Sequence, residues 1–141
     1  MKRIVLLFFI SAQILDPIKW KIQQNKINDE YIELEFIADI DSGWHLYSQY
    51  TGQYYNDDGP VPTSFTFKIS DYYSLLDSVL ELQPIEDYDA IWDETLKYYK
   101  NTTVFTQKIK LLTQEPFSVV GEINFMLCLS LIHISEPTRP Y

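Results

Sequence analysis

Apolar and polar residues alternate along several stretches of the chain, and this alternation predicts β-strands. In the segment Tyr31–Ile40, every second residue is apolar, while Glu33, Glu35 and Asp39 occupy alternate positions. A period of two is that of a strand with one face buried and one face in water. The segments 65–69 and 105–111 alternate in the same way, with Phe, Ile and Leu on one face and Thr and Lys on the other.

Four further segments have the composition of strands: 18–26, 44–48, 72–82 and 117–128. Turn-forming residues separate the segments, among them Asp41-Ser42-Gly43 and Asp57-Asp58-Gly59-Pro60. The segment 72–82 also fits a short helix, because its Leu and Val residues would share one helical face. Seven or eight short strands predict an all-β fold, an antiparallel β-sandwich of two sheets.

In the last of these segments, 117–128, alternate residues fall on opposite faces of the strand. This alternation predicts the direction in which Cys128, the single cysteine of the chain, points. One face of the segment is almost wholly apolar and is made of Phe117, Val119, Gly121, Ile123, Phe125 and Leu127. Unless a bulge intervenes, Cys128 therefore points away from the core at the end of the strand.

The N-terminal residues 1–13 have the features of a secretory leader. Met1-Lys2-Arg3 is basic, Ile4–Ile10 is an unbroken apolar run, and Ser11-Ala12-Gln13 offers small residues for cleavage after Ala12 or Gln13. The apolar run is too short to span a bilayer, which needs about 20 residues. We expect an exported protein, with a first core strand as the alternative for residues 4–10.

The C-terminal residues 129–141, LSLIHISEPTRPY, resemble the frame translation of a transposase adapter used in sequencing libraries. Composition agrees, because all the Lys and Arg residues between residues 14 and 128 are lysine, whereas Arg139 lies in this tail. A C-terminal strand with a polar tail is the alternative. We expect residues 14–128 to form one domain, interrupted at its C-terminal end just after Cys128.

The net charge of residues 14–128 argues against two classes of binding partner. This segment holds 8 Lys and 19 Asp and Glu residues, a net charge of −11. Nucleic acid and anionic lipid both require clustered Lys or Arg, so neither is an expected partner. A solvated acidic surface explains the charge without identifying a partner.

Cys128 is the candidate reactive residue. In an oxidising compartment a lone cysteine is expected to have a partner, within the chain or outside it, although an inert buried thiol remains the alternative. His45 is the sole histidine outside the tail, so the chain lacks the three or four ligands of a zinc site and no metal or other cofactor is expected. A nucleophilic pair of Cys128 and His45 is conceivable, but no third group supports it.

Four stretches of the chain form a recognisable series: GWHLYSQ at 43–49, GPVPTSFTF at 59–67, FTQKIKL at 105–111 and GEINFMLC at 121–128. In this order and spacing they resemble the periplasmic amino-terminal domain of the thiol:disulfide interchange protein DsbD, in the form of Bacteroidetes-like sequences. The resemblance runs from about Pro17 to Cys128. It implies an immunoglobulin-like sandwich in which Cys128 matches the first of two redox cysteines, while the second has no counterpart here.

The resemblance implies a redox relay. The family's transmembrane portion passes reducing equivalents outward, and this domain hands them to oxidised periplasmic thiol proteins, with cytochrome c assembly among the processes served. The expected partners are therefore the membrane and thioredoxin-like domains of the same full-length reductase, together with those oxidised proteins. Family members shield the cysteines with a cap loop, which corresponds here to residues 88–94 with Tyr88, Ile91 and Trp92.

A second class of function remains open. The tyrosines of residues 49–55 could line a loop that binds glycan, so a secreted, non-redox sandwich that binds glycan or protein through aromatic loops is the alternative. In that case Cys128 would be incidental. As part of a protein-disulfide reductase, the chain as written would be inactive in turnover, because the second cysteine is missing.

Overall fold

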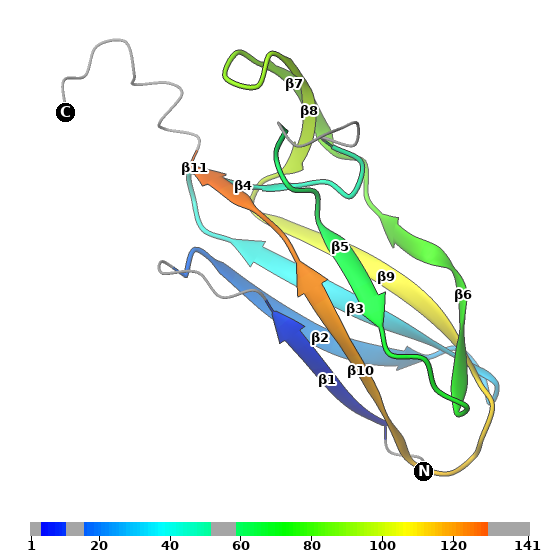
Figure 1. Cartoon of the computed structure of the whole chain (residues 1–141). Helices are drawn as coiled ribbons and strands as arrows, with labels where there is room; N and C mark the ends of the chain where they lie inside the picture. Colours follow the sequence, from blue (N-terminus) through cyan, green and yellow to red (C-terminus); the bar gives the residue numbers. More distant parts are fainter. Residues whose placement is uncertain (1–3, 11–15, 52–58, 130–141) are drawn as a thin grey trace.

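The structure is a computed structural model of the whole chain, and it describes residues 4–10, 16–51 and 59–129 (Figure 1). These residues contain no helix, and therefore no helix able to cross a membrane. Their strands are β1 (Ile4–Ile10), β2 (Ile18–Lys26), β3 (Tyr31–Ile40), β4 (Trp44–Tyr47), β5 (Ser64–Phe67), β6 (Tyr73–Glu81), β7 (Ile85–Asp89), β8 (Glu94–Tyr99), β9 (Thr102–Leu111), β10 (Phe117–Asn124) and β11 (Leu127–Leu129).

The strands form a sandwich. One sheet has the order β2-β3-β9-β6 and lies behind a second sheet of order β1-β10-β5, while a third sheet, β11-β4-β8-β7, extends one end of the molecule (Figure 1). All strand pairs are antiparallel except β1 with β10. The predicted all-β sandwich is confirmed.

Strand β3 shows why the alternating pattern produces this fold. Its even-numbered residues are buried, with Leu34, Phe36 and Ala38 fully so, and the residues between them are more exposed. On the outer face, Glu33 lies opposite Lys108 of β9, a pairing of opposite charges that favours this register. The period-two prediction for β3 is confirmed.

Aromatic rings fill the space between the two large sheets. The ring of Phe36 on β3 lies 4.9 Å from that of Phe65 on β5, and Phe65 lies 5.1 Å from Phe105 on β9. At one end of this row, Trp20 of β2 lies 5.6 Å from Phe125. Contacts across the two sheets at these distances are typical of a packed sandwich core.

The segment that also fitted a helix is the strand β6, so the helical alternative is wrong. The strand is irregular between Leu76 and Leu80, where Asp77 has a φ of 60°. The buried side chain of Gln107 on β9 donates hydrogen bonds to the carbonyls of Leu76 and Asp77, at 3.0 and 3.2 Å. The bulge therefore removes ladder bonds that a side-chain amide replaces.

The pattern predicted one continuous strand over residues 117–128, and this prediction is wrong. Strand β10 ends at Asn124, and after Phe125 and Met126 the chain enters β11, which belongs to the third sheet. Phe125 is still buried in the main core and Leu127 packs against it, so the predicted apolar parity continues into β11.

Residues 4–10 form the strand β1 in the structure of the whole chain. This corresponds to the first core strand that the sequence left open. Cleavage of the predicted leader after Ala12 or Gln13 stays a prediction. The predicted adapter-derived tail lies outside the described residues except for Leu129, which ends β11.

Candidate functional site

Strand β11 brings Cys128 to the third sheet. Its partner is β4, and the antiparallel register places Cys128 directly opposite His45. Residues that face each other in this way project their side chains to the same side of the sheet. Tyr47, two residues beyond His45, lies on that side as well.

The β7–β8 hairpin forms the adjoining part of this sheet and carries the predicted cap loop at its tip. The carboxylate of Asp89 accepts hydrogen bonds from the backbone N–H groups of Ile91 and Trp92, at 2.8 and 3.2 Å. This is an Asx turn, in which a short acidic side chain stabilises a tight reversal. Asp93 completes the turn with a φ of 56° and accepts a hydrogen bond from the Tyr88 hydroxyl.

A small hydrophobic cluster, separate from the main core, surrounds the thiol. Its buried members are Tyr47, Leu96 and Tyr98, and the half-buried side chains packed on them are Trp92, Met126 and Cys128. These six residues are called the thiol cluster below. The ring of His45 lies against the thiol cluster, 4.2 Å from the ring of Tyr98 in an edge-on contact.

Electrostatic effects connect the hairpin to the thiol through Tyr47. The indole N–H of Trp92 lowers the pKa of the Tyr47 hydroxyl, and the Tyr47 hydroxyl lowers the pKa of the Cys128 thiol, each against the larger effect of burial.

The site keeps the sulfur protonated. Burial raises the pKa of the Cys128 thiol, the nearby negative charge of Asp89 raises it further, and the hydrogen bond from Tyr47 acts in the opposite direction. Burial also raises the pKa of Tyr47, so this hydroxyl remains a donor throughout the neutral range. The site therefore holds a protonated thiol, and the Tyr47 hydroxyl is the group that favours its thiolate.

The structure brings together some of the residues that the sequence singled out. Trp92 packs in the thiol cluster with Cys128. Tyr88 and Ile91 are exposed on the hairpin, at 62% and 63%, and are not part of the cluster. Their role as a cap stays a prediction.

Sequence reasoning missed the roles of Tyr47 and Asp89. Tyr47 lies within the stretch 43–49 that carries the family resemblance, and its spacing of two from His45 was the available signal. Asp89 had no signal beyond its place in an acidic loop. Of the tyrosine loop at 49–55, Tyr50 is described and half exposed, whereas residues 52–58 lie outside the described residues.

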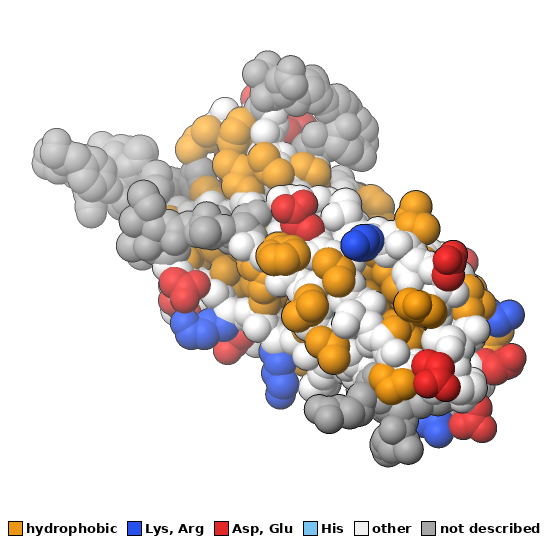
Figure 2. All heavy atoms as spheres, turned by 60° about the horizontal axis from the view of Figure 1, so that its bottom comes forward, with side chains coloured by type: hydrophobic (Ala, Val, Ile, Leu, Met, Phe, Trp, Pro, Cys, Tyr) orange, Lys and Arg blue, Asp and Glu red, His pale blue; other side chains and the backbone are white. Residues whose placement is uncertain are grey.

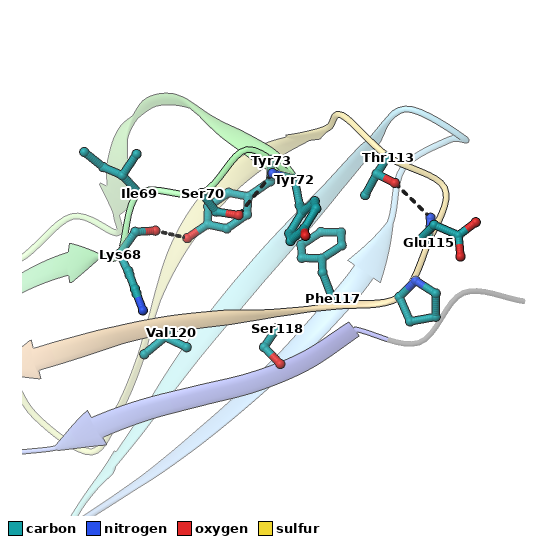
Figure 3. Close-up of a pocket in the computed structure, with 11 residues that line it drawn as sticks. Lys68, Ile69, Ser70, Tyr72, Tyr73, Thr113, Glu115, Phe117, Ser118 and Val120 are labelled. Atoms are coloured by element: carbon teal, nitrogen blue, oxygen red, sulfur yellow. Dashed lines mark hydrogen bonds between the residues drawn. The ribbon is translucent and has the colours of Figure 1, made fainter.

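Another concave region lies where the loops 68–73 and 113–117 approach β10. It is a shallow cavity of about 420 Å³ in which Tyr72 leans over Phe117, with ring centroids 6.0 Å apart, and Lys68 and Glu115 stand at its margin (Figure 3). Figure 2, with the bottom of the molecule turned forward, shows hydrophobic side chains scattered among polar and charged ones. Within the described ranges, no three His, Cys, Asp or Glu side chains gather as a metal site.

The class of protein that fold and site define is an all-β sandwich with a half-buried thiol on a side sheet. The chain matches no protein-family model, and no curated protein matches it significantly.

Proposed function

We propose that this chain is a thiol–disulfide exchange domain, immunoglobulin-like in its sandwich, that relays electrons from a membrane reductase to oxidised proteins of the periplasm. The observation that carries the proposal is the seating of Cys128 on Tyr47 beside Trp92 of the hairpin. Exchange requires a thiolate, which the Tyr47 hydroxyl favours, while burial raises the pKa of the Cys128 thiol overall.

The stretches behind the family resemblance support the proposal. GWHLYSQ at 43–49 contains β4 with Tyr47, and GEINFMLC at 121–128 leads into β11 with Cys128. These two stretches are far apart in the sequence, yet β4 and β11 pair with each other. Two of the four stretches that carry the resemblance therefore lie on the paired strands of the thiol site.

The chemistry follows from the thiol and its donor. The thiolate of Cys128 attacks one sulfur of a partner's disulfide, the S–S bond breaks, and a mixed disulfide forms while the departing thiolate takes up a proton. A second thiol, which the resemblance places downstream of Cys128, would then attack the mixed disulfide. That step releases the reduced partner and leaves this domain oxidised.

A single cysteine carries out the first half of this cycle. We therefore expect the 141-residue chain to trap oxidised partners and not to turn over. Incubation with glutathione disulfide should add one glutathionyl group, measured by intact mass, and Cys128→Ser should add none. With dithiothreitol as reductant, disulfide reduction should not exceed the rate of the reductant alone. A folded chain that forms no mixed disulfide would contradict the relay, and robust turnover would contradict the trapping.

A further inference from the structure

The edge of β10 holds a strand whose sequence is that of a leader. Seven consecutive residues of β1 pair with β10 in parallel, from Ile4 opposite Phe117 to Ile10 opposite Ile123 (Figure 1). The other edge of β10 pairs with β5. Removal of residues 1–13 would therefore leave β10 as an open edge with unpaired N–H and C=O groups.

The place of β1 is shaped around one side chain, Phe8. Its ring contacts those of Phe36 and Phe67 edge-on, with centroids 5.0 and 5.5 Å away. Its partner residue on β10 is Gly121, where an added Cβ would lie 2.5 Å from the Phe8 ring and would also collide with the Thr66 carbonyl. The absence of a side chain at Gly121 creates the space that the ring occupies.

The outer face of β1 does not suit a permanent edge strand. Val5, Leu7 and Phe9 are exposed at 47%, 48% and 67%. Antiparallel or mixed sheets that face water normally carry polar residues at such positions, and natural edges are protected by charge. A leader, in contrast, requires an apolar residue at every position of this run.

We propose that the edge of β10 is an acceptor site for an extended apolar strand, occupied by Ile4–Ile10 in the unprocessed chain and opened when the leader is removed. The inference rests on the export that the proposed function includes. It does not depend on the thiol.

The occupant is a polypeptide segment that adds as a parallel strand, the mode of recognition known as β-strand addition. Backbone hydrogen bonds to β10 supply affinity, and side chains at alternate positions supply specificity. The inner positions of β1 are Ile4, Leu6 and Phe8, so the preferred segment has apolar residues two apart with an aromatic ring opposite Gly121. Partly unfolded proteins offer such segments.

The test uses the full chain with a specific protease site between residues 13 and 14. The folded protein is cut, the N-terminal fragment is removed, and a fluorescent peptide of residues 1–13 is added while anisotropy is recorded. Phe8→Ser and Phe9→Ser peptides form a matched pair, since the two rings differ in facing inward or outward. We expect the wild-type peptide to rebind, Phe8→Ser to weaken binding at least about ten-fold, and Phe9→Ser to change it less than about three-fold.

Several results would overturn the inference. One is failure of the wild-type peptide to rebind a cut protein that keeps its circular dichroism spectrum, and another is equal weakening of peptide binding by both substitutions. Loss of the fold on release of the fragment, or dimerisation of the cut protein through β10, would overturn it as well. The experiment is repeated with Cys128→Ser, which abolishes disulfide exchange. Peptide binding that persists there separates this site from the proposed redox function.

Discussion

At Cys128, two neighbouring groups act on the same sulfur in opposite directions. The carboxylate of Asp89 disfavours the thiolate, and the hydroxyl of Tyr47 favours it. Because burial raises the pKa of the thiol, the thiolate forms at higher pH than in an exposed cysteine, and reaction with iodoacetamide should be slow at neutral pH.

The substitution Asp89→Asn isolates the charge. The amide oxygen of Asn can still accept from the N–H groups of Ile91 and Trp92, so the turn is kept while the negative charge is lost. We expect the pKa of Cys128 to fall and alkylation to be faster at pH 7, measured by mass spectrometry over a pH series. An unchanged pH profile would show that Asp89 does not act on the sulfur.

The substitution Tyr47→Phe isolates the hydrogen bond. Without the phenol donor, the pKa of Cys128 should rise and the alkylation profile should move to higher pH. Tyr98→Phe is the matched control, because Tyr98 lies in the same thiol cluster while its hydroxyl donates to Asp87. A shift of equal size in both variants would mean that loosened packing, and not the hydrogen bond, controls the thiol.

Trp92 offers a test of the cap. Its side chain packs in the thiol cluster, whereas that of its neighbour Ile91 is exposed. Trp92→Ala should therefore speed alkylation of Cys128 several-fold by opening the cluster to reagent, and Ile91→Ala should leave the rate unchanged. If the Trp92→Ala variant reacts at the wild-type rate, the hairpin does not shield the sulfur.

Among the strands, β6 contains a bulge that a side-chain amide stabilises. The amide of Gln107, a residue 1% exposed, donates to two carbonyls at the irregularity. Gln107→Leu keeps the volume and removes the donor, which should cost about 0.5–1.5 kcal/mol in the free energy of unfolding, because two partly buried hydrogen bonds to carbonyls are lost. Urea denaturation measures this, with exposed Gln114→Leu as the control. Equal stability of both variants would contradict the argument.

The elements also show where sequence reasoning succeeds. Strands such as β3 and β9 could be predicted because one face is buried along their whole length, so the period of two is uninterrupted. The break between β10 and β11 could not, since Phe125 and Leu127 continue the apolar parity while the chain passes from one sheet to another. Strand β7 was missed because it is largely exposed and shows no alternation.

The candidate site was predictable in part for a related reason. Cys128 could be singled out by its uniqueness in the chain and Trp92 by the family resemblance. The contribution of Tyr47 depends on β4 pairing with β11, and that pairing joins residues about 80 positions apart in the sequence. Local patterns carry no information on such contacts, which arise from the packing of sheets.

For the molecule as a whole, the thiol lies outside the core that holds the sandwich together. The main core contains the aromatic row and the buried faces of β2, β3, β9 and β10, whereas the thiol cluster has three buried residues on a side sheet. Regions with few buried contacts open locally at lower free energy than the global transition. The proposed redox function would benefit from such local opening, because the sulfur would become accessible while the sandwich remains folded.

Two leucines test this division of the molecule. Leu34 lies in the main core and Leu96 in the thiol cluster, and their exposures are 0% and 2%. Leucine-to-alanine substitutions in cores cost about 2–5 kcal/mol, more where the surroundings cannot collapse. We expect Leu34→Ala to fall near the upper end in urea denaturation and Leu96→Ala near or below the lower end. Leu96→Ala should nevertheless accelerate alkylation of Cys128 more than Leu34→Ala does. Equal losses of stability with equal alkylation rates would show that the thiol cluster and the main core unfold as one unit.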